Sequence, residues 1–545
     1  MQGWTDRRTI GQVLDDVATE HGPAACLIFG DQRITFAQLK LRVDAVAGGL
    51  LRLGLKPGDK VALWLHNRLE FLYIFFAVAK IGALLVPINT RFTAAEAEYV
   101  LRQSNAKALI FADRIHTTDY LGHLRDLLPE MEQMTGGALQ SPRLPDLCYL
   151  ICDSETVYPG LQRLQQLTDE GARFPAHHLA RVAAAVGPDD PMFIAYTSGT
   201  TGFPKGVVHA HYLVQNTRDV GERVAFTPRD CGLIYLPLFH GFGLFTAFLS
   251  GFIRGVPFVL MERFEAGEAL KLIQQEQVTL LYGFDTHFRD LLEHPAFSTY
   301  DLRSLRTGIM ATGVPRLEPL IQEVLTRLCR VGGAYGLSEG SFIATLTRLD
   351  DADERRYAGS GCALPAFELK IVDPDIGATQ PPGVAGEICL RGFPIMQGYY
   401  NKPAETARAI DTEGWLHTGD MGTMDAEGYL RFLGRYKEML KVGGENVDPM
   451  EVETLLQRHP SVSLAQVVGV PDRRLAEVGM AFVQLKEGAI VTEQELIAFC
   501  QDKLARFKIP RYVHFVKEYP MTASGKVQKF KLQEMGAAEL GPGHE

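Results

Sequence analysis

The chain has 545 residues, of which 46% are hydrophobic and 22% are charged, and its formal net charge is −10. This length exceeds what one compact core accommodates, so about two to four structural units are expected. The composition is typical of a globular protein, and the acidic balance excludes the basic electrostatic footprint of a nucleic-acid-binding protein.

Cysteine usage and the N-terminus both predict a cytoplasmic location without a membrane span. The eight cysteines are scattered, and Cys148 and Cys152 lack metal-ligand CxxC spacing, so we interpret them as reduced thiols. The segment Met1 to Arg8 has no apolar core, and no signal peptide is expected. The apolar run from Phe71 to Ile88 is interrupted by Lys80, a glycine and a proline, which favours a buried helix followed by a strand.

The N-terminal part of the chain alternates helices with strands. Thr35 can cap a helix, Gln38 can return the hydrogen bond, and Ile34 can pack on Leu39. The elements expected next are a strand at 61–65, a helix at 69–81, a strand at 83–88, a helix capped by Thr93 and Glu96, and a strand at 108–111. This alternation predicts α/β layers with mostly parallel strands. Residues 134–146 are expected to form a surface excursion.

Residues 196–206, Tyr-Thr-Ser-Gly-Thr-Thr-Gly-Phe-Pro-Lys-Gly, have the composition of a phosphate-binding loop. Glycines allow consecutive N–H groups to converge on an anion, hydroxyls add donors, and lysine supplies a point charge. The flanking segments 192–195 and 206–209 resemble short strands, which predicts a hairpin tip rather than a helix entry. A polar surface turn is the alternative. The residues expected to contact phosphate are Thr197, Ser198, Gly199, Thr200, Thr201, Gly202 and Lys205.

The end of the chain is predicted to be a separate small α+β unit. A strand–helix alternation resumes from Ile234 to about Val331, and the small unit begins after residues 434–437. Asp448, Pro449 and Glu451 form a strong helix start, with Glu451 expected to close a capping box. Strands are expected at 464–470, 480–485 and 512–516, with a helix capped by Thr492 and Glu495.

Further motifs follow in order along the chain, and together they are a specific signal. They are Phe-His-Gly-Phe-Gly at 239–243, Gly-Ala-Tyr-Gly-Leu-Ser-Glu at 333–339, Gly-Trp-Leu-His-Thr-Gly-Asp at 414–420, Gly-Arg at 434–435 and Met-Thr-Ala-Ser-Gly-Lys at 521–526. With the loop at 196–206, this series resembles the adenylate-forming enzymes, which include acyl-CoA synthetases, peptide-synthetase adenylation domains and beetle luciferases. The resemblance covers nearly the whole chain.

The resemblance implies an α/β fold with a large N-terminal domain of layered α/β subdomains, a hinge and a small mobile α+β domain. The expected bounds are 1–435 for the N-terminal domain, 436–437 for the hinge, with Lys437 as the pivot, and 438–545 for the small domain. ATP, Mg²⁺ and CoA are the implied cofactors. Glu339 is expected to hold Mg²⁺, and Lys526 to serve adenylation. The implied nucleotide and CoA contacts are Gly333, Ala334, Tyr335, Gly336, Ser338, Asp420, Arg435, Lys441, Gly443 and Gly444.

The same resemblance places the acid beside the adenine. Where many relatives have Ser-Gly-Gly-Ala-Pro, this chain has Ala-Thr-Gly-Val-Pro at 311–315, so its pocket is expected to differ in shape. The aromatic lining carries no obvious cation, which favours an apolar acid over an amino acid or a dicarboxylate. The residues expected to line the pocket are Phe239, His240, Phe245, Tyr282, Phe284, Thr312 and Val314.

Several of these residues have structural alternatives. His240 could be a packed core histidine, Lys526 a solvated surface lysine and Asp420 a turn residue; the order of the motifs favours functional roles. His209 and His211 alternate on a strand, but without further ligands a structural role is expected.

The expected function is that of an AMP-forming acyl-CoA synthetase: acid and ATP give acyl-AMP and pyrophosphate, and CoA then accepts the acyl group. The expected catalytic residues are Lys205, His240, Glu339 and Lys526. An acyl-AMP ligase that serves a carrier protein or partner enzyme is the first alternative. A luciferase-like oxygenase and a catalytically silent ligand-binding scaffold are the others. We expect a monomer or a homodimer, and the identity of the acid stays open.

Overall fold

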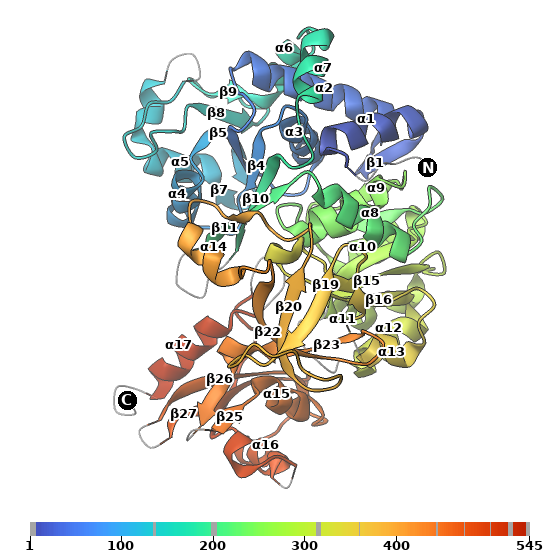
Figure 1. Cartoon of the computed structure of the whole chain (residues 1–545), viewed down its shortest axis with the longest axis vertical. Coiled ribbons are helices and arrows are strands. Elements are labelled where there is room, and N and C mark those ends of the chain that lie inside the picture. The colour runs from blue at the N-terminus through green and yellow to red at the C-terminus, as the bar shows by residue number, and fades with distance from the viewer. Residues whose placement is uncertain are drawn as a thin grey trace.

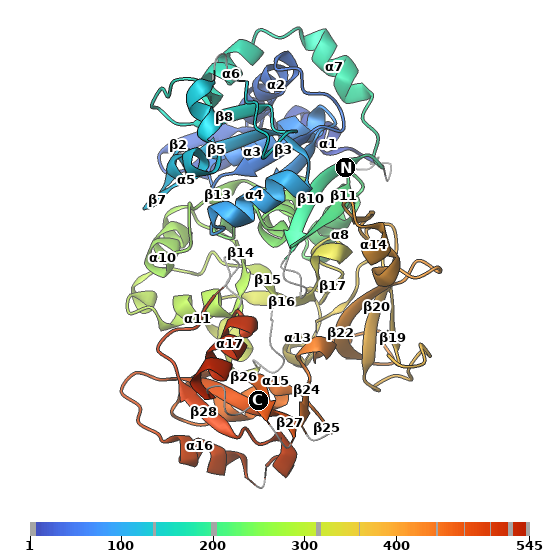
Figure 2. The same ribbon diagram turned by 90° about the vertical axis from the view of Figure 1, so that its left-hand side faces the viewer.

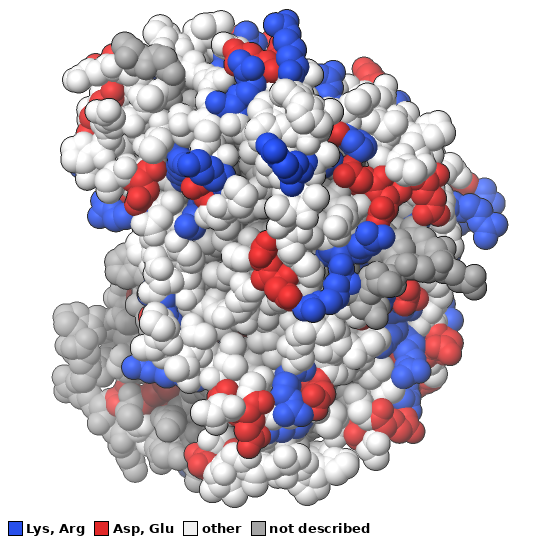
Figure 3. All heavy atoms as spheres, turned by 45° about the horizontal axis from the view of Figure 1, so that its top comes forward, with Lys and Arg blue, Asp and Glu red and all other residues white. Residues whose placement is uncertain are grey.

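The computed structural model describes residues 7–134, 138–197, 204–311, 318–358, 360–442, 445–472, 475–501, 503–521 and 527–540. Figure 1 shows the N-terminal elements at the top, a second α/β layer below them, and the C-terminal elements at the foot. Figure 2 shows the same arrangement after a quarter turn. On the face seen in Figure 3, basic and acidic side chains are interspersed in small groups.

The first sheet has eight strands in the order β21-β11-β10-β4-β3-β5-β8-β9. The strands from β10 to β9 are parallel, whereas β11 runs antiparallel to both β10 and β21. Parallel neighbours need crossover connections, and helices supply most of them, as predicted. The strands are β3 (Lys60–Trp64), β4 (Leu84–Pro87), β5 (Ala106–Ala112), β8 (Tyr149–Asp153), β9 (Gln162–Arg163), β10 (Pro191–Thr197), β11 (Lys205–Ala210) and β21 (Gly398–Tyr399). The helices are α1 (Ile10–His21), α2 (Phe36–Arg52), α3 (Leu69–Lys80), α4 (Ala94–Gln103), α5 (Tyr120–Leu127), η1 (Pro129–Gln133), α6 (Leu164–Gly171) and α7 (Ala176–Ala184), with a small hairpin of β6 (Arg114–Ile115) and β7 (Thr118–Asp119).

The second sheet has nine strands in the order β18-β17-β16-β15-β14-β12-β13-β1-β2. Its central strands are parallel, and antiparallel strands close both edges. The strands are β1 (Ala25–Phe29), β2 (Gln32–Thr35), β12 (Gly232–Ile234), β13 (Phe258–Leu260), β14 (Leu280–Phe284), β15 (Thr307–Ala311), β16 (Arg330–Tyr335), β17 (Thr345–Leu346) and β18 (Cys362–Ala363). The helices are α8 (Leu213–Arg223), the π-helix η2 (Phe242–Leu249), α9 (Ser250–Phe252), α10 (Ala266–Gln275), α11 (Asp285–Glu293), η3 (Phe297–Thr299), α12 (Glu318–Arg327), η4 (Ser338–Gly340) and α13 (Asp353–Ala358).

A third, four-stranded antiparallel sheet connects these layers to the C-terminal unit. Its strands are β19 (Glu368–Val372), β20 (Gly386–Arg391), β22 (Leu416–Met424) and β23 (Leu430–Arg435), and α14 (Pro403–Ala409) precedes β22. The C-terminal unit is an α+β fold whose sheet has the order β25-β24-β27-β26, with β28 also pairing with β27. Its elements are η5 (Tyr436–Glu438), β24 (Leu440–Val442), β25 (Glu445–Val447), α15 (Pro449–Gln457), β26 (Val462–Asp472), β27 (Ala476–Leu485), α16 (Glu493–Cys500), η6 (Arg506–Lys508), β28 (Tyr512–Phe515) and α17 (Lys529–Leu540).

Two large hydrophobic cores divide the molecule. One includes buried residues from Ile10 to Leu430, and the other includes buried residues from Leu440 to Leu532. The first core spans both large sheets, because Phe75 of α3 meets Phe245 of η2 edge to face with ring centroids 5.8 Å apart. This arrangement confirms the predicted large N-terminal and small C-terminal domains.

The apolar run from Phe71 to Ile88 is buried core, as predicted. It forms α3, which is buried along nearly its whole length, followed by the buried strand β4. Among the described residues, no helix combines the length and apolar character needed to cross a membrane. The cytoplasmic location stays a prediction.

Local capping signals predict helix starts well. Thr35 and Gln38 exchange side-chain-to-backbone hydrogen bonds at the start of α2, and equivalent capping boxes open α4 and α16. At α15, Asp448 caps the helix by accepting from the N–H of Met450, but Glu451 does not close the box. Its carboxylate instead lies 2.6 Å from the ammonium of Lys508. That part of the prediction is wrong because an ion pair with a distant segment competes for the carboxylate.

The surface excursion predicted for residues 134–146 is wrong in part. Leu139 and Leu144 are 4% and 2% exposed and belong to the first core. Residues 135–137 lie outside the described chain. The polar and proline residues around these two leucines suggested a surface loop, although the leucine side chains themselves pack into the core.

Candidate functional site

The hairpin predicted around the glycine-rich loop is present. Strands β10 and β11 are antiparallel, and Thr197 pairs with Lys205 at the point where the loop begins and ends. A side chain at Gly206 would bring its Cβ to 2.8 Å from Cγ2 of Ile194, so glycine permits the close approach of the two strands. Residues 198–203 lie outside the described chain, which leaves Thr197 and Lys205 as the described members of the predicted phosphate loop.

Lys205 lies between an acidic residue and a tyrosine ring. Its ammonium is 3.0 Å from a carboxylate oxygen of Glu405 and 4.7 Å from the centroid of the Tyr399 ring. Tyr399 lies on β21, directly beside β11, and pairs with Val207 there. The hydrogen bond to Lys205 is the main cause of the lowered pKa of Glu405. Lys205 is therefore a cation that the protein holds in place on two sides.

The Tyr399 hydroxyl connects Lys205 to Glu339. It donates to Oε1 of Glu339 over 2.8 Å. Burial, followed by the adjacent Glu339 carboxylate, raises the pKa of Tyr399 well above its usual value, so the phenol stays protonated and remains a donor. The backbone of Glu339 is also held, because its carbonyl accepts from the N–H of Met396 over 2.8 Å. The 3₁₀ turn η4 thus presents Glu339 in a defined position.

His209 supports the same turn from β11. Its Nε2 lies 2.7 Å from the carbonyl oxygen of Ser338. His211 is also buried, and its Nδ1 accepts from the N–H of Ile10 over 3.2 Å. Burial lowers the pKa of both imidazoles to about 4. Both histidines have structural contacts to the backbone, in keeping with the structural interpretation.

A second cluster forms around Asp420, whose side chain is 4% exposed. The Tyr335 hydroxyl donates to Oδ2 over 2.7 Å, and Nε of Arg435 lies 3.0 Å from Oδ1. Burial is the largest cause, and Asp420 the second, of the raised pKa of Tyr335, whereas the charge of Asp420 is the main cause of the raised pKa of Arg435. The structure therefore brings together three predicted nucleotide contacts from β16, β22 and β23.

The glycine-containing strand β16 leads into this cluster. The N–H of Gly333 donates to Oγ1 of Thr347 over 3.1 Å, and Ala334 is buried. A Cβ at Gly336 would lie 2.2 Å from the carbonyl oxygen of Phe342, so only glycine fits where the chain leaves the strand. Gly336 thus allows the chain that leaves β16 to pass close to the backbone of Phe342 and Ile343.

The predicted acid pocket maps to an aromatic region around η2. His240 precedes this π-helix, and its Nδ1 accepts from the N–H of Phe242 over 3.2 Å. Phe284 meets Phe242 edge to face at 5.3 Å. Phe245 is fully buried and stacks on Phe342 at 5.2 Å, Tyr282 is fully buried near Phe226, and Phe239 is half-buried. π-Helical segments are frequent at functional sites.

Comparisons with known proteins place this geometry in a family. The family described as AMP-binding enzyme matches residues 14–400, and the family described as AMP-binding enzyme C-terminal domain matches residues 451–526. The chain belongs to the AMP-binding enzyme family.

Named relatives of this AMP-binding enzyme cover almost its whole length. YngI of Bacillus subtilis (strain 168), provisionally named as an acyl-CoA synthetase, is 40% identical over 531 residues, 96% of each chain. The mitochondrial medium-chain acyl-CoA ligase ACSF2 of Rattus norvegicus is 37% identical over 98% of this chain and 89% of its own. Among solved structures, the anthranilate CoA ligase AuaEII with anthranoyl-AMP superposes with a TM-score of 0.83 at 28% identity, covering 98% of both chains.

Other predicted residues of this AMP-binding enzyme lie outside the described part of the chain or have side chains that are not described. The loop members 198–202, the pocket residues Thr312 and Val314, the pair Gly443 and Gly444, and Lys526 lie outside the described residues. The side chains of Lys437 and Lys441 are likewise not described. The roles proposed for these residues therefore stay predictions.

Two residues of the described site were missed by the sequence analysis. Tyr399 and Glu405 contact Lys205 although they lie nearly two hundred positions away along the chain. The signal available in the sequence was the tyrosine pair at 399–400, but a tyrosine pair alone is common in protein cores.

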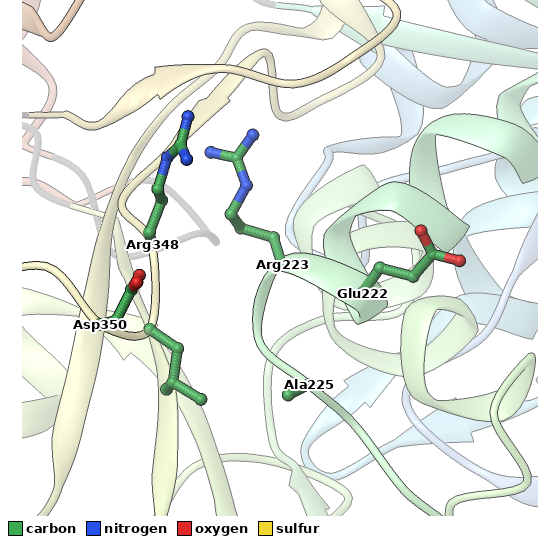
Figure 4. Close-up of a pocket in the computed structure, with 6 residues that line it drawn as sticks. Glu222, Arg223, Ala225, Arg348 and Asp350 are labelled. Atoms are coloured by element: carbon green, nitrogen blue, oxygen red, sulfur yellow. The ribbon is translucent and has the colours of Figure 1, made fainter.

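A separate hollow of about 500 Å³ lies where α8 ends (Figure 4). Figure 4 shows the side chains of Arg223 and Arg348 extending in the same direction. The guanidinium of Arg223 donates to the carbonyl oxygens of Leu346 over 2.7 Å and Ala363 over 3.1 Å, so it joins α8 to the edge of the second sheet. The hollow contains none of the predicted site residues; it is lined by Glu222, Arg223, Ala225, Arg348, Leu349 and Asp350.

Proposed function

We propose that the protein is an AMP-forming acyl-CoA synthetase that activates an apolar carboxylic acid. Acid and ATP give acyl-AMP and pyrophosphate, and the thiol of CoA then displaces AMP to form the thioester. The observation that carries the proposal is the pair of polar clusters around Glu339 and Asp420, within a chain whose full-length relatives are named acyl-CoA synthetases or ligases. The relatives' names do not favour a carrier-protein ligase.

The described residues fit the demands of adenylation. The attacking carboxylate, the α-phosphate and the leaving pyrophosphate are all anionic, so the site must neutralise and align charge. Lys205 supplies a cation at the phosphate loop. Asp420, held by Tyr335 and Arg435, supplies a carboxylate suited to accept from ribose hydroxyls. Lys526 is proposed to supply a second cation, which neutralises negative charge at the α-phosphate.

The Glu339 site fits Mg²⁺ in its donor chemistry. Mg²⁺ prefers oxygen ligands and is commonly held by one or two carboxylates together with substrate phosphates. Glu339 is half-buried, and Tyr399 donates to one of its oxygens, which orients the carboxylate. Glu339 would hold the ion, which would supply charge neutralisation at the phosphates.

The aromatic surroundings of η2 support an apolar acid. Phe242 and Phe284 place two phenyl rings edge to face beside η2, and apolar contacts discriminate by about 1–3 kcal/mol per methylene. Since ACSF2 is named a medium-chain ligase, medium-chain fatty acids are the first acids to test. Thr312 and Val314 are proposed to shape this pocket.

We further propose that the small domain rotates between the two half-reactions. The buried residues of the first hydrophobic core end at Leu430, and those of the second begin at Leu440. This division supports domain bounds at 1–435 and 438–545 with a pivot at Lys437. Hinges absorb large backbone changes at a few residues at the ends of elements. Rotation would withdraw Lys526 and present Lys441, Gly443 and Gly444 to the pantetheine arm of CoA.

The test separates the half-reactions. A panel of acids is screened for ATP–pyrophosphate exchange, and the acids that react are then assayed with CoA. Lys526→Ala is expected to lose pyrophosphate exchange by about 10²–10³-fold while still converting supplied acyl-AMP and CoA to thioester. Lys531→Ala, which alters an exposed lysine on the following helix, is the matched control. Normal exchange by Lys526→Ala would refute its assignment, and absence of exchange with every acid would refute the proposed activity.

A further inference from the structure

A group of three potential metal ligands lies on the third sheet, away from the predicted Mg²⁺ position at Glu339. Within the described part of the chain, Glu387, Cys389 and His417 each offer one ligand atom, and these atoms lie within 4.8 Å of one another. In the sequence, Cys389 has the features of an ordinary reduced thiol, and His417 lies within the motif at 414–420 whose expected nucleotide contact is Asp420.

The sheet register creates the group. Cys389 on β20 and His417 on β22 are direct cross-strand partners, and Sγ lies 3.6 Å from Nδ1. Glu387 lies two positions before Cys389, so its side chain reaches the same face of the strand. One of its oxygens, Oε2, is 2.8 Å from Nδ1 of His417. The imidazole nitrogen Nδ1 therefore faces both a thiol and a carboxylate.

The other imidazole nitrogen also has a partner. Nε2 of His417 lies 3.4 Å from Oδ2 of Asp411. Asp411 is itself held in a turn, because its Oδ1 accepts from the N–H groups of Glu413 and Trp415 over 2.9 Å each. Histidines that bind metals almost always donate the second ring N–H to a carboxylate or carbonyl, which fixes the tautomer and the ring orientation. Asp411 is placed to do this for His417.

Access and charge also suit a bound cation. Cys389 is fully buried against Val372 and Trp415, whereas the His417 side chain is 35% exposed, so an ion could enter from the imidazole side. The nearby cations are engaged elsewhere: Lys370 and Arg391 lie over the Trp415 ring at 4.2 and 4.4 Å. Arg391 is also paired with Glu368. Glu387 and Asp411 leave the group with acidic character.

We propose that Glu387, Cys389 and His417 form a Zn²⁺ site, with Asp411 orienting the histidine. Zn²⁺ binds thiolate, imidazole and carboxylate together, and sites with three protein ligands keep a fourth position for water. On binding, the Cys389 thiol loses its proton to solvent, and the metal replaces the contact between Oε2 of Glu387 and Nδ1 of His417. This proposal does not depend on the proposed ligase activity.

Binding would reach the nucleotide segment through Glu387. Its second oxygen, Oε1, accepts from the N–H of Gly419 over 2.9 Å, and Gly419 directly precedes Asp420. Gly419 has a φ of +70°, a conformation that glycine adopts without strain. The bound ion would therefore connect β20 to the part of β22 that carries Asp420.

The experiment uses tag-free, full-length protein that has been stripped of metal and kept reduced with a non-thiol reductant. Co²⁺ is the spectroscopic probe, since a thiolate ligand adds an intense near-ultraviolet charge-transfer band to its visible d–d bands. We expect one equivalent of Co²⁺ to produce this band and one equivalent of Zn²⁺ to displace it. Cys389→Ser should remove the band. Asp411→Asn should weaken Zn²⁺ binding by about 10–100-fold, as is usual for a residue that orients a metal ligand.

Cys148→Ser is the matched control, because it removes a free, partly exposed thiol outside this group. It should leave the band and the affinity unchanged. Circular dichroism melting checks that Cys389→Ser is folded; if it is not, His417→Gln replaces it and should lose most of the Zn²⁺ affinity. A wild-type protein without a thiolate band, or a band that persists in folded Cys389→Ser, would overturn the proposal whatever the ligase assays give.

Discussion

Replacing Tyr399 with phenylalanine tests the connection between Lys205 and Glu339. The change removes the hydroxyl that donates to Glu339 over 2.8 Å, but it keeps the ring that Lys205 overlies at 4.7 Å. A hydrogen bond to a charged group contributes about 1.5–3 kcal/mol. Glu339 is half-buried, so water can replace part of this bond, and the lower value applies. At about 1.4 kcal/mol per tenfold change, kcat/KM for adenylation should fall about tenfold.

The assay is ATP–pyrophosphate exchange at several Mg²⁺ concentrations. If Tyr399 orients the carboxylate that holds Mg²⁺, the variant should need more Mg²⁺ for half-maximal rate, whereas acyl-AMP conversion by CoA should change little. Tyr399→Leu should lose a further ~0.5–1 kcal/mol, because it also removes the ring face from the Lys205 ammonium.

Tyr400→Phe is a close control for this change. The Tyr400 hydroxyl contacts Oδ1 of Asn105 over 3.4 Å, so its removal should leave the exchange rate near wild type. If Tyr399→Phe matches Tyr400→Phe in both kcat/KM and Mg²⁺ response, the hydroxyl does not position Glu339 and the reasoning fails.

Two further predictions concern stability. Lys80→Ala removes a side chain that is 5% exposed and whose ammonium lies 2.7 Å from both Asp15 and Asp44. Because those carboxylates keep some solvent contact, the free energy of unfolding should fall by about 2 kcal/mol, less than the roughly 3–5 kcal/mol lost when a fully buried pair is broken. An unchanged urea midpoint would contradict this. His209 and His211 have pKa values lowered to about 4, below the ~6.5 of the unfolded chain. The stability that their neutral forms contribute is therefore complete above pH 6.5 and is lost as the pH falls toward 4. The free energy of unfolding should fall by about 3 kcal/mol for each histidine. Equal urea midpoints at pH 7 and pH 4.5 would contradict that sign.

The sequence predicted features that depend on neighbouring residues. The capping box of Thr35 and Gln38 lies within four consecutive residues. The hairpin of β10 and β11 follows from two short apolar segments on either side of one loop. The motif order also identified Tyr335, Asp420 and Arg435, which lie on three strands but converge in the structure. A motif series predicts such a cluster because it carries the geometry of a whole family.

Contacts between distant, unremarkable residues could not be predicted in the same way. Glu451 has the spacing of a capping-box residue, yet it pairs with Lys508, since the ion pair offers its carboxylate a charged partner. The meeting of Cys389 with His417 depends on the register of β20 and β22, which shifts between Glu387 and Cys389. One extra residue in either strand would send these side chains to opposite faces.

Strand β11 links the positions of Lys205 and Glu339, the two residues expected to act on the phosphates. Lys205 and His209 are four positions apart on this strand, so their side chains lie on the same face. His209 holds the carbonyl of Ser338, and Lys205 overlies the tyrosine that donates to Glu339. Two points on one strand therefore fix consecutive residues of η4. A displacement of β11 would move the Lys205 ammonium and the Glu339 carboxylate together, so the separation between them would stay nearly constant.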